Sequence, residues 1–235
     1  MKTKTISLVT LLIIILLTIS SVTTAQAKAK HKKKSEKTEN RTIMLFNGKD
    51  LTNWVFKLKD PSIDPATVFT VQNGVIHISG NPFGYMRTKD FYSDYKLHVE
   101  WRWPLEATNS GVFVHAQPPD SVWLKCVECQ LQAENAGDFV CMNGADMNER
   151  TNKSNPFVKK LAASSEKPTG EWNTMEVICK ANTIEVNVNG VLQNRGTNVN
   201  LSRGSICLQS EGKEIEFRNV VLTSFAPLHP WKKIK

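Results

Sequence analysis

Polar side chains occupy every second position of the segment VECQLQ, residues 127–132, which otherwise reads like a buried β-strand. Glu128, Gln130 and Gln132 would share one face of that strand, because successive side chains of a strand point to opposite sides of the sheet. A carboxyl group can take or give a proton, and an amide can donate and accept hydrogen bonds at once. The segment therefore predicts a face that holds a hydroxyl-rich ligand and can do proton chemistry on it.

Three further segments repeat this pattern of an apolar face opposite a polar one. The non-core face carries Glu100 and Arg102 in the segment 97–103, His115 beside the aromatic Phe113 in the segment 111–116, and Gln209 and Glu211 in the segment 205–211. Carboxylates and amides pair with vicinal hydroxyls, and an aromatic ring covers the apolar face of a pyranose. Together these positions predict a carbohydrate groove, and an ordinary solvated sheet face is the alternative.

Short alternating runs with turn signals between them extend over most of residues 42–235. Asn-Gly pairs at 73–74 and 189–190 each lie between strand-like runs and predict tight hairpins. Long helical periodicity is absent, so more than ten strands must form two stacked sheets around one core. The exception is 146–163, for which we expect a long polar loop with a short helical turn.

The amino terminus has the features of an export signal. Residues 1–27 combine Lys2 and Lys4, an apolar run from Leu8 to Ile19 and a small-x-small site ending at Ala27. That run is shorter than the about 20 residues that a bilayer span needs, so we expect cleavage rather than a retained anchor. We therefore predict three parts: a signal peptide at 1–27, a basic disordered linker at 28–41 and a single domain at 42–235. The mature protein is expected to be periplasmic or extracellular, with no membrane span.

The net charge of +8 does not indicate a nucleic-acid partner. Lys2 and Lys4 leave with the signal peptide, and residues 28–41 carry seven basic and two acidic side chains, which leaves about +1 on the remaining residues. The basic stretch has almost no apolar residues and is typical of a solvated spacer, with adhesion to an anionic surface as its alternative role.

Five motifs resemble, in order, those of the bacterial 3-keto-disaccharide hydrolase family. They are LFNGKDLTNW, NSGVFVHA, ECQL followed by AGDF, GEWN, and GSICLQSEGKEIEFRNVVL, and the resemblance extends over about residues 44–225. The resemblance implies a concanavalin-like jelly roll of two curved antiparallel sheets, with sugar bound on the concave sheet. It also implies distant similarity to β-glucanases of the laminarinase type.

The resemblance also implies which residues form the site. Glu128 corresponds to the glutamate of the family's Glu-x-Gln segment, Asn109 opens the strand that leads to His115, and Glu211 follows the late Leu-Gln pair. The β-glucanases carry two glutamates and an aspartate in a Glu-x-Asp-x-x-Glu run, whereas this chain has Gln130 and Ala133 at its second and third acidic places. Their retaining mechanism therefore cannot be transferred.

Two chemistries stay open for these residues. A conventional glycosidase needs two carboxyl groups about 5–5.5 Å apart for retention or about 6.5–9.5 Å apart for inversion, and Glu128 with Glu211 or Glu100 could supply either. A 3-keto-glycoside can instead lose its acidic C2 hydrogen and eliminate the glycosidic oxygen before hydration. That route needs one glutamate as base, the other as acid, and His115 or Arg102 to polarise the ketone. No cofactor is expected, although a divalent cation held by His115 and Glu128 could replace Arg102.

The five cysteines leave two further alternatives open. Alternation sends Cys126 and Cys129 to opposite faces, so they do not form half of a zinc site. A hairpin centred on Asn135 would set Cys129 opposite Cys141, either as a disulfide or as two buried thiols. Because one fold can serve catalysis or binding, a lectin-like module that holds glycan without cleaving it is the alternative to an enzyme.

Overall fold

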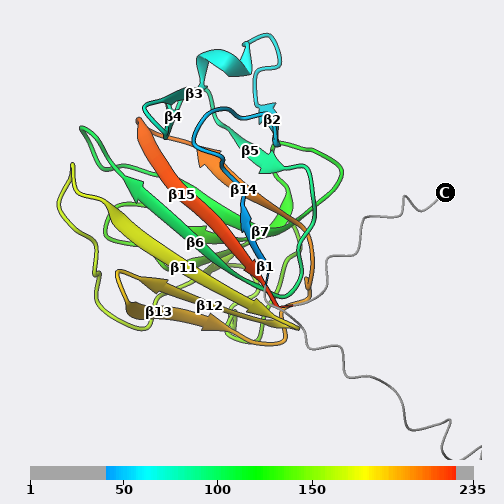
Figure 1. The fold of residues 1–235 in the computed structure, drawn as a ribbon. Coiled ribbons are helices and arrows are strands. Elements are labelled where there is room, and N and C mark those ends of the chain that lie inside the picture. Colours follow the sequence, from blue (N-terminus) through cyan, green and yellow to red (C-terminus); the bar gives the residue numbers. More distant parts are fainter. Residues whose placement is uncertain (1–40, 226–235) are drawn as a thin grey trace, which may run out of the picture. The chain divides into compact units, whose positions relative to one another are not determined.

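The computed structural model describes residues 41–225, and strands make up most of them (Figure 1). The strands are β1 (Arg41–Met44), β2 (Trp54–Leu58), β3 (Phe69–Gln72), β4 (Val75–Ile78), β5 (Gly84–Thr88), β6 (Tyr95–Arg102), β7 (Gly111–Gln117), β8 (Lys125–Gln130), β9 (Phe139–Met142), β10 (Phe157–Val158), β11 (Asn173–Lys180), β12 (Thr183–Val188), β13 (Val191–Gly196), β14 (Ser205–Ser210) and β15 (Ile215–Ser224). The one helical element among the described residues is a 3₁₀ turn, η1 (Pro65–Thr67).

The strands form two antiparallel sheets that pack face to face, which confirms the predicted all-β jelly roll. The eight-stranded sheet has the order β13-β12-β11-β6-β15-β4-β3, with β1 pairing to β15. The seven-stranded sheet has the order β10-β9-β8-β7-β14-β5-β2. In Figure 1 the eight-stranded sheet faces the viewer, and β5, β7 and β14 lie behind it.

Strict alternation in the central strands builds the core between the sheets. Along β6, the buried residues Tyr95, Leu97, Val99 and Trp101 alternate with partly exposed ones. On the opposing sheet, alternate residues of β7, β8 and β14 join the same apolar cluster. Each fully buried large side chain contributes about 1.5–3 kcal/mol to folding, so the inner faces fix the register and with it the face on which every polar residue emerges.

Local turn chemistry agrees with the predicted hairpins. At both Asn-Gly pairs the two residues have positive φ, at 50° and 76° for Asn73 and Gly74 and at 49° and 82° for Asn189 and Gly190. Such pairs match the twist of the strands they join. The segment 146–163 is a polar loop as predicted, but it holds the short strand β10 and no helical turn.

The β8–β9 hairpin decides between the two alternatives for the cysteines. Cys129 pairs with Phe139, and Cys141 pairs with Val127. The hairpin is therefore centred on Glu134, which has φ of 64°, and not on Asn135. The predicted opposition of Cys129 and Cys141 is wrong by two residues, and both cysteines are buried free thiols.

The described residues fall within one compact unit of the chain, Thr38–Lys235. The predicted signal peptide at 1–27 and nearly all of the predicted linker at 28–41 lie outside the described residues. Within 41–225 there is no helix of the length and apolar character that a membrane crossing requires.

Candidate active site

A pocket of about 430 Å³ opens on the outer face of the seven-stranded sheet, the face turned away from the core. It brings together five of the ten predicted site residues. The residues that line it are Asn109, Trp123, Glu128, Gln130, Val140, Cys141, Met142, Asn143, Pro156, Phe157, Gln209 and Glu211.

Gly111 makes room for the central carboxyl group of this pocket. It pairs with Gln130 across β7 and β8, and the next outward pair along these strands is Phe113 with Glu128. A Cβ atom added to Gly111 would overlap the carboxyl group of Glu128. The glycine of the Asn-Ser-Gly motif therefore allows the Glu128 side chain to lie flat across the neighbouring strand.

Glu128 is a buried carboxyl group without a compensating partner. Only 5% of its surface is exposed, and its Oε1 atom has no hydrogen-bond partner among the described residues. Burial, followed by the nearby charge of Glu211, raises its pKa from 4.5 to about 8. A carboxyl group in such surroundings keeps its proton at neutral pH and can donate it.

Glu211 stands in a more polar environment within the same pocket. Burial also raises its pKa, but hydrogen bonds from the side chains of Asn109 and Gln209 act in the opposite direction. The Nε2 atom of Gln209 donates to Glu211 Oε2 at 2.8 Å. Amide donors favour the ionised form of a carboxyl group, so Glu211 is better able than Glu128 to lose its proton.

The amides of the pocket present unused hydrogen-bonding atoms. Asn109 Oδ1 and Gln209 Oε1 are shielded from solvent and have no partner within residues 41–225. Gln130 Oε1 accepts the backbone N–H groups of Leu131 and Gln132 at 2.9 and 3.0 Å, which fixes the amide and leaves Nε2 as its donor. A buried acceptor without a partner costs about 1–3 kcal/mol, which a ligand hydroxyl group would offset.

A strap of residues 118–124 covers the neighbouring part of the same sheet face and supplies a side chain that the sequence patterns missed. Arg87 anchors it by donating to both carboxylate oxygens of Asp120, at 2.6 and 2.7 Å, and Tyr85 donates to Ser121 O at 3.0 Å. The strap presents Trp123 at the pocket with 58% of its surface exposed. No periodicity could reveal Trp123, because it lies in a loop.

Trp123 is held rigidly although it is exposed. Its carbonyl oxygen accepts hydrogen bonds from Ser121 Oγ at 2.7 Å and Asn143 Nδ2 at 3.2 Å, and its ring lies 4.7 Å from that of Phe83. Phe157, on the edge strand β10, is a second exposed ring at the same pocket and was likewise not predicted. Exposed, fixed aromatic rings beside unpartnered polar atoms are the usual ingredients of a sugar site.

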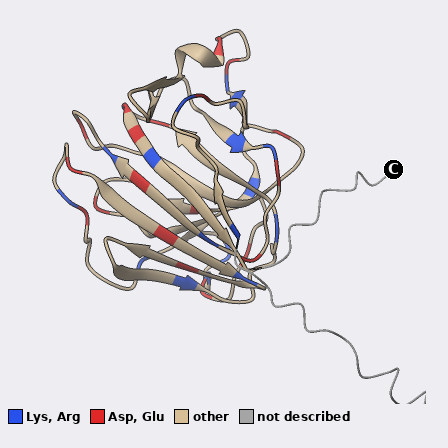
Figure 2. Cartoon of the chain, viewed as in Figure 1, with Lys and Arg blue, Asp and Glu red and all other residues tan. Residues whose placement is uncertain are grey.

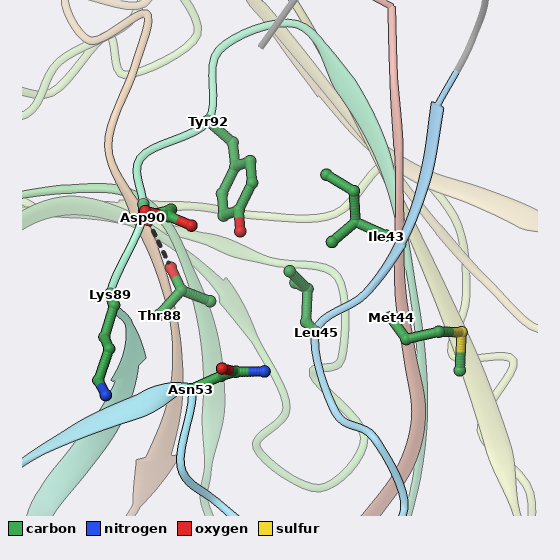
Figure 3. Close-up of a pocket in the computed structure, with 8 residues that line it drawn as sticks. All are labelled: Ile43, Met44, Leu45, Asn53, Thr88, Lys89, Asp90 and Tyr92. Carbon is green, nitrogen blue, oxygen red and sulfur yellow. Dashed lines mark hydrogen bonds between the residues drawn. The ribbon is translucent and has the colours of Figure 1, made fainter. Parts of the chain in front are cut away.

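A second hollow, of about 240 Å³, lies beside β1 and the end of β5 and lacks this chemistry (Figure 3). Its charged residues are Lys89 and Asp90, and the Thr88 hydroxyl group there donates to the Asp90 carbonyl oxygen at 2.9 Å. Its lining contains one carboxyl group and none of the buried unpartnered atoms found among the described residues. The pocket on the seven-stranded sheet is therefore the stronger candidate.

Comparison with protein families places this geometry in a known group. Residues 41–223 match the model of the 3-keto-alpha-glucoside-1,2-lyase-like domain. The chain belongs to this family. The match covers all of β1–β14 and nearly all of β15, and thus both sheets and the whole pocket, as the sequence motifs predicted. None of the curated protein sequences compared with the chain matches it.

Solved structures that resemble this family member share its fold. One is a presumed glycosyl hydrolase from Parabacteroides distasonis, with 22% identity, coverage of 79% of this chain and 100% of that chain, and a TM-score of 0.57. The carbohydrate-binding module CBM66 from Bacillus subtilis has 8% identity, coverage of 74% and 96%, and a TM-score of 0.55. The β-glucanase of Bacillus licheniformis has 12% identity, coverage of 80% and 99%, and a TM-score of 0.53. At these identities the likeness concerns the jelly-roll fold.

His115, which the motif comparison placed at the site of this family member, points the other way. A bulge shifts the β7–β8 register between Val114 and Gln117, and His115 adopts a positive φ of 53°. Its ring nitrogens lie 3.1 and 3.4 Å from the carbonyl oxygens of Leu201 and Ser93, and burial lowers its pKa. The structure therefore places His115 away from the pocket and from Glu128, contrary to the predicted face, because a bulge reverses the alternation on which that prediction depended.

Glu100 and Arg102 also lie away from the pocket. They belong to β6 of the eight-stranded sheet, where they project from its outer face. There Glu100 accepts hydrogen bonds from Arg218 and Asn219, and Arg102 pairs with Glu216. Alternation correctly separated polar from apolar residues on β6, but it could not say to which sheet the strand belongs.

Two other predicted positions lie near the pocket without lining it. Phe113 emerges on the predicted face but is fully buried, packed with Tyr85 and Leu124 beneath the strap. Gln132 lies beyond the end of β8, in the turn to β9, where it is exposed and accepts a hydrogen bond from Asn135 Nδ2 at 3.5 Å. Neither side chain is placed to bind a ligand directly.

Proposed function

We propose that the protein cleaves glycosides, with the sugar bound in the pocket of the seven-stranded sheet, and that 3-keto-glycosides are its substrates. The observation that carries this proposal is the convergence of three buried acceptor atoms without partners, on Asn109, Glu128 and Gln209, next to a second carboxyl group. Sugar hydroxyl groups are the natural donors for such atoms. The family match supports the 3-keto substrate, and the export signal predicted at residues 1–27 supports action outside the cytoplasm.

The two glutamates divide the chemistry in this proposal. The 3-keto group makes the C2 hydrogen acidic, and ionised Glu211 removes it as a proton. The electron pair then forms a C1–C2 double bond as the bond from C1 to the glycosidic oxygen breaks, and Glu128 gives that oxygen its proton. Water adds across the double bond in the second half of the reaction, with oxygen joining C1 and a proton returning to C2. The raised pKa of Glu128 and the amide donors around Glu211 fit these two roles.

The group that polarises the ketone must come from the pocket itself. His115 and Arg102, the two predicted polarisers, do not line the pocket. Gln130 does, and its fixed amide retains Nε2 as a donor. We assign Gln130 this role, because a donor aimed at a developing negative oxygen stabilises the transition state more than the ground state.

Trp123 is proposed to stack on the sugar that leaves. Replacing Trp123 by Ala should raise KM about 10- to 100-fold for a disaccharide, since the loss of a stacked indole ring corresponds to about 1.4–3 kcal/mol. Trp123→Phe should restore most of the affinity, and Leu105→Ala, which removes an exposed apolar side chain outside the pocket, should change nothing. Steady-state kinetics on the four proteins checks this, and an unchanged KM for Trp123→Ala would remove Trp123 from the site.

Turnover of matched sugars in heavy water tests the proposed function. We expect cleavage of a 3-keto-glucoside with one deuterium at C2 of the released sugar, and no cleavage of the unmodified glucoside. Direct hydrolysis would break the same bond without placing deuterium at C2. If deuterium entered C2 of the 3-keto-glucoside without cleavage, the protein would catalyse only the proton transfer. If the cleaved product carried no deuterium at C2, the elimination mechanism would be refuted.

A sugar-binding module without turnover is the second candidate, favoured by the structural likeness to CBM66. In that case calorimetry would detect glycan binding while both glucosides stay intact. The buried carboxyl group of Glu128, whose Oε1 atom has no partner among the described residues, is the observation that speaks for the enzyme, because a binding site gains little from a group that is costly to bury.

A further inference from the structure

A histidine and two glutamates meet on the outer face of the eight-stranded sheet, where His77 lies on β4, Glu216 on β15 and Glu214 directly before β15. His77 pairs directly with Glu216 across these strands, and Glu214 lies two residues before Glu216. The Nδ1 atom of His77 lies 3.3 Å from Glu214 Oε1 and 3.2 Å from Glu216 Oε1. All three potential ligand atoms lie within 4.8 Å of one another. Neighbouring strands thus hold one nitrogen and two carboxylate oxygens at a single point.

His77 can donate to only one of the two carboxylate oxygens that face its Nδ1 atom when the imidazole is neutral. A neutral ring carries at most one hydrogen on Nδ1, and that hydrogen can be given to one oxygen. Ligand atoms about 2.0–2.2 Å from a tetrahedral zinc ion lie about 3.3–3.5 Å from each other. The observed separations of 3.3 and 3.2 Å are close to those edges.

Glu216 is positioned from its other side. It is 95% buried, and its second oxygen, Oε2, accepts the Nε–H group of Arg102. Arg102 in turn lies over the ring of Trp172, with Cζ 4.7 Å from the ring centroid. These contacts fix the carboxylate so that Oε1 faces His77, as the partners behind metal ligands commonly do.

We propose that His77, Glu214 and Glu216 bind one divalent transition-metal ion, for which zinc is the probe. One imidazole and two carboxylates suit zinc and its neighbours, and the partial exposure of His77 and Glu214 leaves the fourth position to water. Because the ligands come from two paired strands, the ion ties β4 to β15 near the edge of the sheet. The site lies on the other sheet from the pocket and is independent of the proposed catalytic function.

Zinc binding to the untagged full chain tests the site, with calorimetry and thermal unfolding as readouts. We expect one equivalent to bind and, at a zinc concentration about 100 times Kd, a rise of about 5–10 °C in Tm. His77→Ala should abolish both effects, and Glu214→Gln should weaken binding about 10- to 100-fold. Glu214 is 44% exposed, so the second variant is expected to fold even where the first does not.

His98→Ala is the matched control on the same sheet, on strand β6. Both acidic and basic residues occur on the strands of this sheet (Figure 2). His98 also faces two carboxylates, but through different ring nitrogens, with Nε2 3.7 Å from Glu100 and Nδ1 3.8 Å from Glu176. It cannot join both carboxylates on one ion and should bind no zinc. Undiminished binding in Glu214→Gln, or equal loss in His98→Ala, would overturn the assignment. The assignment would also be overturned if the parent protein bound no zinc at millimolar concentration. In that case the contacts of His77 and Arg102 with the two glutamates would be purely structural.

Discussion

Replacing Glu128 by Gln is expected to lower turnover of a 3-keto-glucoside by about 10² to 10⁴ while the fold persists. The amide keeps the shape of the side chain above Gly111 but cannot give a proton to the glycosidic oxygen. Affinity should change much less, because the hydrogen-bonding atoms toward the sugar remain. The measurement is kcat from steady-state kinetics together with calorimetric binding on the parent and the variant.

Two further variants separate catalysis from general damage. Gln130→Ala removes the amide that is proposed to polarise the ketone and to orient the ligand, so kcat should fall, although less than in Glu128→Gln, and KM should rise. Glu176→Gln makes the same chemical change on the exposed face of the other sheet and should leave both constants unchanged. If the Glu128→Gln enzyme turned over at nearly the parental rate, the assignment of Glu128 as the general acid would be wrong.

The pH profile gives an independent readout of Glu128. If its protonated form is the acid, kcat/KM should fall about tenfold per pH unit above about pH 8, because the acid is lost as pH rises through its pKa of about 8. The residual activity of Glu128→Gln should lack this limb. A basic limb that persists in the variant would place the titrating group elsewhere.

The fold could be predicted from the sequence because burial imposes a simple pattern on strands. Leu97, Val99, Trp101 and Trp103 alternate with polar residues, and the structure buries all four. The Asn-Gly turns likewise required only local chemistry. What alternation cannot supply is the order of strands in space, since β6 and β8 show the same pattern and lie in different sheets. The sequence pattern therefore placed Glu100 and Glu128 on the same face, although their strands lie in different sheets.

The site was predictable where strands are regular and unpredictable where they are not. Glu128, Gln130 and Gln209 share one face because β8 and β14 keep their alternation on either side of Gly111. His115 breaks the pattern through a bulge, which depends on tertiary contacts with Leu201 and Ser93. Trp123 was missed because its position follows from the anchored strap, and no periodic signal encodes a loop.

Glu128→Gln is also expected to stabilise the protein at alkaline pH relative to the parent. The carboxyl group of Glu128 has a pKa of 4.5 in its unperturbed form and about 8 in the folded state. Between these values the folded chain holds a proton that the unfolded chain has released, so the free energy of unfolding falls as pH rises. Since one pKa unit corresponds to about 1.4 kcal/mol, the loss between pH 4.5 and pH 8 amounts to at most about 5 kcal/mol.

Glutamine does not titrate, so the free energy of unfolding of the Glu128→Gln variant should not fall with pH in this way. The difference in Tm between Glu128→Gln and the parent should grow steadily from pH 4.5 to pH 8, by at most about 10–20 °C, and level off above pH 8. Thermal unfolding across this range measures it, with Gln130→Ala as a control whose profile should run parallel to that of the parent. A constant difference between Glu128→Gln and the parent would mean that Glu128 is ionised in the folded protein. The same burial that makes Glu128 costly for the fold is what keeps its proton available for the leaving oxygen at neutral pH.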